Sequence, residues 1–345
     1  MSPLISVIMP LFNSQKWVEK SLTSLLKQSY ENFEILIYND GSTDNSLGIV
    51  NAYAHDNNKI KIIDSNSNSG IVTALNTLVW ESHGEYIARM DADDIAHPDR
   101  LQQQINFMAT KKVDLCGTWF KEIGQGPERI TRWPTSHEAL EAAFLFQNSI
   151  CHPTVIAKRY VFDEFPYRNS FNLAEDYDFF IRAMQSYKFA NVPQALLNYR
   201  RHPTQATQAK KDQMEGITKV IRINALKNIG INPTNEQARV HNLIRAPHSI
   251  TDINDLNSIE SWLFSLLSIN KSSEFNSVVA SQWIRACIRA APLGLSMVRK
   301  FNSSRLLDKT NINLLTHVDI AAIGALRLNY NSEFFKILRR IGLSA

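Results

Sequence analysis

Short apolar runs alternate with stretches of helical periodicity through about the first two hundred residues. Runs of apolar and β-branched residues predict buried strands at Ile5–Met9, Phe33–Tyr38, Ile60–Ile63 and Tyr86–Met90. Between them, apolar residues three or four positions apart predict helices at 15–28, through Ile49 and Tyr53, and at 71–82. Repeated β-α units of this kind predict an α/β fold with a doubly wound, mostly parallel sheet covered by helices on both faces.

The pattern changes after a last predicted strand at Ala195–Tyr199. Beyond Gln205 the periodicity is helical, and the Thr234–Gln237 pair reads as a capping box that opens one of the helices. The other helices are expected at 214–226, 255–268, 274–290 and 332–341. We therefore predict a catalytic domain at residues 1–205 and a helical carboxyl-terminal annex at residues 206–345.

Charge divides the chain in the same way. Residues 1–204 carry 19 Lys and Arg against 23 Asp and Glu, whereas residues 205–345 carry 18 against 10. A basic region of this kind can face nucleic acid, anionic lipid or an acidic partner. The annex lacks the basic and aromatic surface motifs of a nucleic-acid reader, so no nucleic-acid partner is expected.

Cysteine usage and hydropathy bear on the compartment. The scattered residues Cys116, Cys151 and Cys287 form neither a disulfide framework nor a metal-binding pair, which suits a reducing environment. No basic stretch precedes the first apolar run, which Pro10 interrupts, so no signal peptide is predicted. No apolar run approaches the ~20 residues of a membrane-spanning helix. These features predict a cytoplasmic protein.

Polar residues gather where the predicted strands end. Asn13, Asp40, Asn68 and the Asp91-Ala92-Asp93-Asp94 run all occupy such positions, and ligands of open α/β sheets bind there. Three carboxylates within four residues repel one another, and a divalent cation such as Mg²⁺ or Mn²⁺ relieves that repulsion. A solvated acidic turn is the commoner explanation of an isolated Asp-x-Asp. The position directly after a strand favours a metal site.

Several other function classes lack their expected signals. No Gly-x-Gly-x-x-Gly follows the first strand and no Gly-Lys-Ser/Thr loop is present, which argues against a dehydrogenase and a P-loop nucleotidase. A sugar nucleotidyltransferase would carry a glycine-rich basic loop where this chain has Leu11–Ser14. A glycoside hydrolase using Asp93 and Asp176 would not need a nucleotide site. A non-catalytic nucleotide-sugar-binding scaffold also remains open.

A set of short motifs, each weak alone, becomes specific through its order and spacing. They are Ile5–Asn13, Tyr38–Asp44, Asn68–Gly70 with Ala74–Asn76, Gly84–Asp94, Pro98-x-Arg100, His152–Thr154, Ala174–Asp178 and Tyr199–His202. Over about the first 205 residues the chain resembles family 2 of the inverting glycosyltransferases, which have the GT-A fold. The resemblance implies a GT-A-like sheet and transfer of a sugar from a nucleotide donor.

The resemblance also implies a uridine diphosphate site. Its residues would be Pro10, Phe12, Asn13, Asp40, Ser42, Asn68 and Gly70. Phe12 would stack on the base, and Asp40 would accept a hydrogen bond from the base or the ribose. Many relatives have Arg where this chain has Leu75, so a charge contact to the donor phosphates is either missing or supplied by Arg89.

Further residues are assigned by the same resemblance. Asp91 would hold the ribose and contribute to the metal site, Asp93 would bind the metal, and His202 is a further candidate ligand. Asp176 resembles the general base that removes the acceptor hydroxyl proton, with Glu175 beside it. Acidic residues in a first helical turn are commonly just partners of the helix dipole.

The expected reaction is a single in-line displacement that inverts the anomeric carbon. The donor would be a UDP-sugar carrying a hexosyl or N-acetylhexosaminyl group. Bacterial members of this appearance build O-antigen or capsule units, so the acceptor would be a glycan, linked to polyprenyl diphosphate. Trp119 and Trp133 would form an acceptor platform, although core packing is the default for such residues.

A lipid-linked acceptor suggests peripheral attachment to an anionic membrane. Basic and apolar residues interleave at Trp283–Arg289, Val298–Phe301 and Phe334–Ile341, and basic amphipathic helices can lie in a bilayer interface. The alternative is that these faces pack against the rest of the protein. We predict salt-sensitive attachment to the inner face of the cytoplasmic membrane through residues beyond about 270.

Overall fold

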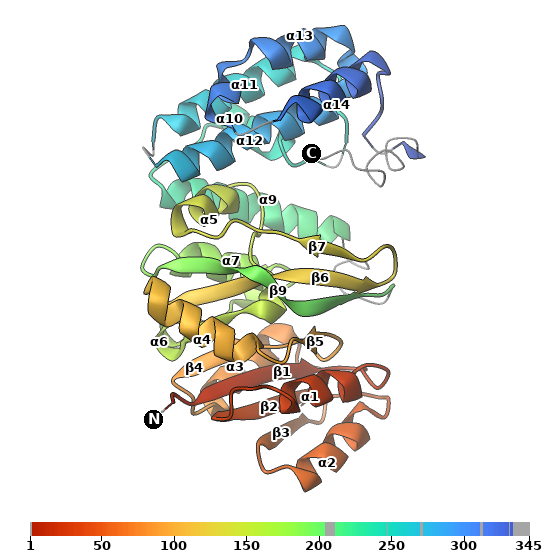
Figure 1. Cartoon of the computed structure of the whole chain (residues 1–345), viewed down its shortest axis with the longest axis vertical. Helices are drawn as coiled ribbons and strands as arrows, with labels where there is room; N and C mark the ends of the chain where they lie inside the picture. Colours follow the sequence, from red (N-terminus) through yellow and green to blue (C-terminus); the bar gives the residue numbers. More distant parts are fainter. Residues whose placement is uncertain are drawn as a thin grey trace. The chain divides into compact units, whose positions relative to one another are not determined.

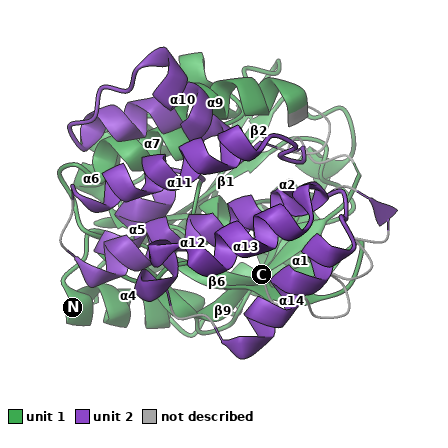
Figure 2. Cartoon of the chain, turned by 90° about the horizontal axis from the view of Figure 1, so that it is seen from above, with its two compact units in different colours: residues 1–137, 148–221 green, residues 138–147, 222–345 purple. Residues whose placement is uncertain are grey.

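The computed structural model describes residues 2–203, 211–246, 248–269, 272–310, 313–330 and 332–333. The chain forms two compact units, shown in green and purple in Figure 2. The first comprises residues 1–137 and 148–221, and the second comprises residues 138–147 and 222–345. The boundary predicted at residue 205 lies within the first unit.

The first half of the sheet in unit 1 is parallel, as the β-α periodicity predicts. Strand β1 (Ile5–Leu11) lies between β2 (Phe33–Asp40) and β4 (Tyr86–Arg89), and β3 (Ile60–Ser65) pairs with β2 (Figure 1). All three pairings are parallel. The carboxyl ends of these strands, and the polar residues that follow them, therefore share one edge of the sheet.

The second half of the sheet is mixed. Strand β8 (Ile156–Lys158) runs antiparallel to β4 and to β6 (Leu115–Gly124), and β9 (Phe189–Arg201) pairs in parallel with β6. The short strand β5 (Ile95–Ala96) pairs antiparallel with β9, and β7 (Arg129–Thr131) pairs with β6. Only β9 was predicted from the sequence, and only in part.

Helices cover both faces of the sheet. Alternate side chains of β1 share one core with helices α1 (Val18–Leu26), α2 (Ser46–Asp56) and α4 (Arg100–Lys111). Helix α3 (Ile71–Glu81) contacts β1 and β2 and contributes no residue to that core, so it covers the opposite face. This confirms the predicted α/β architecture, with helices on both faces of the sheet. The shorter helices are α6 (Arg159–Glu164), α7 (Glu175–Ala183), η1 (His152–Thr154) and η2 (Asn169–Phe171).

The second unit is helical in its described part. Its helices are α10 (Asn235–Leu243), α11 (Ile253–Leu267), α12 (Ser273–Arg289), α13 (Leu295–Ser303) and α14 (Leu314–Ala325), with η3 (Ala291–Leu293) and η4 (Arg305–Lys309). Helices α5 (His137–Phe144) and α9 (Lys211–Asn228) run across the boundaries of the units. The Thr234–Gln237 capping box is present, which confirms that prediction.

The basic amphipathic segment predicted at 283–289 is mainly a packing element. Trp283, Ala286 and Cys287 are fully buried and Ile288 nearly so, which makes the apolar side of α12 part of the core of unit 2. The helix predicted at 332–341 lies almost wholly outside the described residues. Among the helices that the structure describes, none is long and apolar enough to cross a bilayer.

Candidate active site

The loops that follow β1 and β2 are joined by hydrogen bonds. The backbone N–H of Asn13 donates to Ser42 Oγ over 3.1 Å, and Asn13 Oδ1 accepts from the backbone N–H of Thr43 over 2.8 Å. Asn13 adopts a positive φ of 47°, which Asn tolerates better than most residues. Phe12 beside it is 48% exposed, while Pro10 is half-buried. Phe12 therefore offers an open aromatic face at this edge.

Asp40 ties the end of β2 to the loop that follows β3. Its carboxylate accepts hydrogen bonds from the Ser69 N–H, the Ser69 hydroxyl and the Gly70 N–H, at 2.6, 2.8 and 3.0 Å. A Cβ at Gly41 would lie 2.9 Å from the backbone nitrogen of Asn68, so this close approach requires glycine. Asp40 thus shapes the loop that carries Asn68 and Gly70.

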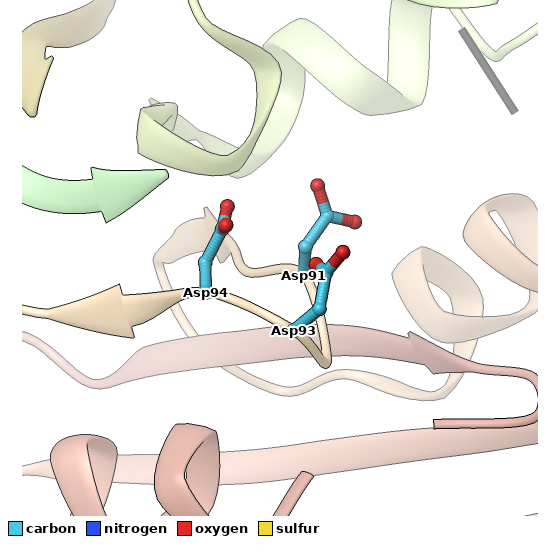
Figure 3. Close-up of side chains that lie close together, drawn as sticks. All are labelled: Asp91, Asp93 and Asp94. Carbon is cyan, nitrogen blue, oxygen red and sulfur yellow. The ribbon is translucent and has the colours of Figure 1, made fainter. Parts of the chain in front are cut away.

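The three carboxylates after β4 converge. Ligand oxygens of Asp91, Asp93 and Asp94 lie within 4.8 Å of one another, and Figure 3 shows the three side chains on one side of their loop. Burial, together with the charge of Asp91, raises the pKa of Asp93. Burial and the charge of Asp93 raise the pKa of Asp94 more strongly. Such crowding is what a bound cation would relieve.

Two residues at the carboxyl end of β9 and directly after it, more than a hundred positions further along the chain, contact this cluster. His202 Nε2 lies 2.8 Å from Asp93 Oδ2, the Arg200 N–H donates to Asp94 Oδ1 over 2.8 Å, and Arg200 Nε donates to the Asp93 carbonyl over 2.9 Å. The structure therefore brings the predicted residues His202 and Asp93 together. No described atom donates to Asp94 Oδ2, which is buried.

Trp17 supports the same end of β9 and was not identified from the sequence. Its ring stacks on the His202 imidazole at a centroid distance of 5.8 Å, and the Arg200 guanidinium lies over it at 4.5 Å. The sequence alone does not show whether a tryptophan at the start of a helix supports a site in this way or packs in the core. The contact fixes the side chains of Arg200 and His202 beside Asp93.

A second acidic pair opens α7, as predicted. Asp176 Oδ1 accepts from the Tyr177 N–H and Oδ2 accepts from the Asn148 side-chain amide, both at 2.7 Å. Burial raises the pKa of Asp176 to about 6. Burial and the charge of Asp176 raise the pKa of Glu175 to about 7, and no described atom donates to Glu175 Oε2. Two buried carboxyls with raised pKa values are candidates for proton transfer.

Arg89 links the two acidic groups electrostatically. It is 4% exposed and forms an ion pair with Asp91, and its positive charge also opposes the rise in the pKa values of Glu175 and Asp176. One buried guanidinium therefore acts on both groups. A phosphate contact by Arg89 stays a prediction.

Other motif residues have structural roles. The fully buried Arg100 donates to the Arg89 carbonyl over 2.8 Å and to Gln104 over 3.0 Å. Asp178 is paired with Arg182 at 2.9 Å, as the i,i+4 spacing predicts. His152 bonds the Tyr167 hydroxyl at 2.7 Å, and burial lowers its pKa well below the usual range. Each of these side chains is therefore occupied by contacts within unit 1.

Trp119 and Trp133 are neighbours in the folded unit. Both are half-buried, and Trp119 Nε1 donates to the Trp133 carbonyl over 2.9 Å. The side chain of Trp133 packs against the sheet core, and the Arg132 guanidinium lies over the Trp119 ring at 5.6 Å. An acceptor platform therefore stays a prediction for this pair.

Comparison with known proteins identifies the family. The sequence profile described as "Glycosyl transferase family 2" matches residues 6–165. An uncharacterized glycosyltransferase of Haemophilus influenzae is 33% identical over 246 residues, which are 66% of this chain and 76% of the relative. The chain belongs to glycosyl transferase family 2. The O-antigen biosynthesis glycosyltransferase WbnJ of Escherichia coli is 32% identical over 206 residues, 58% of this transferase and 80% of that protein.

Solved structures confirm the fold of the transferase. TarS of S. aureus, residues 1–349 in complex with UDP-GlcNAc, superposes with a TM-score of 0.54 and 17% identity, covering 94% of this chain and 88% of that one. The mannosyltransferase PcManGT of Pyrobaculum calidifontis, in complex with GDP-Man and Mn²⁺, gives 0.52 and 14%, covering 99% and 84%. At such identities the likeness concerns the fold alone.

Asn148 offers a test of how the acidic pair is positioned. Its amide orientation is fixed because Asn148 Oδ1 accepts the Ile150 N–H over 3.2 Å, which leaves the NH₂ group for Asp176. We expect Asn148→Ala to lower kcat by about tenfold, because a hydrogen bond to a charged group contributes about 1.5–3 kcal/mol. The acidic limb of the pH profile of kcat should move upward by about one unit.

Affinity for UDP is the control for Asn148→Ala, and it should stay unchanged. A lower kcat with an unmoved pH profile would make Asn148 a merely structural neighbour of Asp176.

Proposed function

We propose that this transferase moves a hexosyl or N-acetylhexosaminyl group from a UDP-sugar to a hydroxyl of a glycan acceptor, with inversion at the anomeric carbon. The observation that carries the proposal is the pairing of two unlike acidic groups in unit 1. One is the convergent cluster around Asp93 with His202 against it, and the other is the buried pair Glu175–Asp176 with raised pKa values. Activation of a leaving diphosphate and of an attacking alcohol needs such a pair.

Asp93, Asp91 and His202 would hold Mn²⁺ or Mg²⁺. The convergence of the carboxylate oxygens of Asp91, Asp93 and Asp94, the raised pKa of Asp93 and the unpartnered, buried oxygen of Asp94 fit a divalent cation. When bound, such an ion stabilises negative charge on the diphosphate leaving group. Arg200 and Trp17 keep His202 and the Asp93 backbone in place.

Asp176 would act as the general base. The Tyr177 N–H and the Asn148 amide orient its carboxylate, which accepts the proton of the acceptor hydroxyl as that oxygen attacks the anomeric carbon. One displacement without a covalent intermediate inverts the configuration, so an α-linked donor gives a β-linked product. Glu175 is the neighbouring carboxyl that would take over if Asp176 served only in binding.

The donor nucleotide would lie over the joined loops at the ends of β1, β2 and β3. Phe12 offers an exposed aromatic face for stacking on uracil, and Asp40 holds the loop that carries Asn68 and Gly70. Asn13 and Ser42, which bond each other, would line the ribose side together with Pro10. TarS was solved with UDP-GlcNAc and PcManGT with GDP-Man, so the shared fold itself does not select the base.

The acceptor would be a growing surface polysaccharide of the O-antigen or capsule type, carried on polyprenyl diphosphate at the cytoplasmic face of the membrane. The relative WbnJ, described as an O-antigen biosynthesis enzyme, supports this choice. In this proposal the residues up to about 205 bind the donor and carry out the transfer. The helical remainder contacts the acceptor or its membrane.

Calorimetry with UDP tests the donor proposal. We expect UDP to bind in the presence of Mn²⁺, to bind far more weakly in chelator, and to bind more tightly than GDP or dTDP. Phe12→Ala should weaken UDP binding about tenfold or more, because base–aromatic stacking contributes about 1–3 kcal/mol.

Trp80→Ala is the matched control for the loss of an exposed aromatic residue. Trp80 is 84% exposed on α3 of the same unit, so this variant should bind UDP like the unmodified protein. Equal weakening by both variants would remove Phe12 from the base site, and preference for GDP would refute the choice of UDP.

A further inference from the structure

Helix α14 presents an apolar stripe to solvent. Its exposed positions recur at the spacing of one helical face, and every one of them is apolar. They are Leu314, Leu315, Val318, Ala322, Ala325 and the C-cap residue Leu326. Leu314 is 78% exposed, Leu315 66%, Val318 56% and Leu326 58%. The other side of the helix, with Ile320, Ile323 and Gly324, is buried in unit 2. We call the exposed set the α14 stripe.

Helix α13 extends the apolar surface. The two helices lie antiparallel, because the Val298 side chain lies beside Gly324 while Phe301 and His317 are in ring contact at 5.3 Å. Leu295 is 63% exposed at the opposite end of α13, next to Gly294, which the Arg327 side chain contacts. Leu295 therefore lies near the Leu326 end of the stripe.

Two basic side chains border this surface, and two more precede α14 in the chain. Arg327 follows Leu326 directly, and Arg299 is exposed one helical turn after Leu295. Arg305 and Lys309 are exposed in η4, which precedes α14. The stripe itself contains no charged residue. The nearby acidic residues are Asp319, half-buried at its edge, and the exposed Asp308 of η4.

We propose that the α14 stripe, together with Leu295, inserts into the interface of an anionic lipid bilayer. A helix with an apolar face bordered by Lys and Arg can lie in the headgroup region with that face buried about 5–10 Å deep. The border residues Arg299 and Arg327 complement the negative headgroups. The inference goes beyond the transfer reaction and depends neither on the donor nor on the metal.

A second copy of the chain fits this surface less well. The stripe is one helix wide and, at 1.5 Å per residue, about 20 Å long. A stable dimer buries about 1,200–2,000 Å² in total, which calls for a broader patch on each partner. A bilayer needs only a single apolar helix face, so the narrow, cation-bordered stripe favours lipid.

Co-sedimentation of the full chain with vesicles tests the proposal. We expect binding to vesicles of phosphatidylcholine mixed with phosphatidylglycerol, weaker binding to phosphatidylcholine alone, and release at high salt. Val318→Glu should weaken binding about tenfold or more, because it places a carboxylate within the inserted face. Arg299→Gln should weaken binding to the anionic vesicles about fivefold, the effect of one basic residue near the surface.

Val220→Glu is the matched control. Val220 is 52% exposed on helix α9, against 56% for Val318, so the two variants make the same chemical change at equal exposure. We expect Val220→Glu to bind vesicles as the unmodified chain does and both variants to unfold at the same temperature. Equal vesicle binding by Val318→Glu and Val220→Glu would overturn the proposal, as would no binding by the unmodified chain.

Two further results would also overturn it. If Val318→Glu converts a dimer to a monomer in sedimentation velocity and leaves vesicle binding unchanged, the stripe is an interface between copies. If Val318→Glu alone lowers the unfolding temperature without changing vesicle binding, another part of the chain covers the stripe.

Discussion

Asp176→Asn is expected to lower kcat by about 10²–10⁴-fold and to leave donor affinity nearly unchanged. The amide has the size of the carboxylate and can still meet the Tyr177 N–H through its oxygen, but it cannot accept the acceptor's proton. Steady-state kinetics with release of UDP as the signal measures kcat, and calorimetry measures donor binding. Glu175→Gln is the comparison variant, because it changes the adjacent carboxyl in the same way.

The pH dependence adds a second readout for Asp176. Burial raises the pKa of its carboxyl to about 6, and a general base works only when ionised. The kcat of the unmodified transferase should therefore fall as the pH drops through about 6, and Asp176→Asn should lack this limb. A loss confined to donor affinity would make Asp176 a binding residue and turn attention to Glu175.

The same substitution should change how the stability of the fold depends on pH. The raised pKa of Asp176 means that the folded state disfavours the charged form, so stability is lower above the folded pKa than below it. Asn carries no such charge. The new amide cannot accept from both the Tyr177 N–H and the Asn148 amide, so one hydrogen bond is lost. We therefore expect the free energy of unfolding of Asp176→Asn, relative to that of the unmodified protein, to be roughly 1–3 kcal/mol higher at pH 8 than at pH 4.

Asp93→Ala is expected to abolish turnover, with a loss of about 10³-fold or more, and to remove the effect of Mn²⁺ on UDP binding. Asp93 lies in the carboxylate cluster and contacts His202, so its removal takes away the proposed metal ligand and the partner of the imidazole. Chelator should abolish the activity of the unmodified protein, and added Mn²⁺ or Mg²⁺ should restore it.

Asp99→Ala is the matched control for Asp93. Asp99 precedes α4 in the same part of unit 1, its side chain is 50% exposed, and it belongs to no carboxylate cluster. It should retain full, metal-dependent activity. Turnover by Asp93→Ala in the presence of chelator would show that neither Asp93 nor a metal is needed.

The parallel half of the sheet was predictable because its strands are continuous apolar runs separated by helical periodicity. The mixed half was predicted only at part of β9. Strand β5 has two residues, and β6 contains Gly117 and irregular pairing with β9, so neither shows a clear period. Their partners are also far away in sequence, and local patterns carry no information on such pairings.

The residues of the candidate site were likewise predictable only in part. Asp91, Asp93 and Asp176 belong to compact local motifs, so short-range patterns and the family resemblance were enough to select them. Asn148 and Trp17 were missed because a single amide or indole has no diagnostic spacing. Their roles depend on contacts with Asp176 and His202 that only the folded chain provides.

The helices beyond residue 270 show the limit of periodicity in another form. The interleaved apolar residues of 283–289 are in the core, because an amphipathic pattern does not say what covers the apolar side. Helix α14 was overlooked because it is apolar on most sides, from Leu314 to Ala325, and therefore has little amphipathic contrast. The exposure of the apolar side chains distinguishes α14 from the segment 283–289, and exposure can be known only once the unit has folded.

The attachment of the carboxylate loop to β9 has a consequence for biosynthesis. Arg200 meets Asp94 across 106 positions of sequence, and His202 meets Asp93 across 109. At about 5–20 residues per second, a ribosome delivers β9 roughly 5–20 s after the loop it must hold. Strands β1 to β4 can pair during that interval, whereas the acidic loop cannot yet contact Arg200 and His202. A nascent chain therefore assembles the loops at the ends of β1, β2 and β3 first and acquires a complete acidic centre only after residue 202 has left the ribosome.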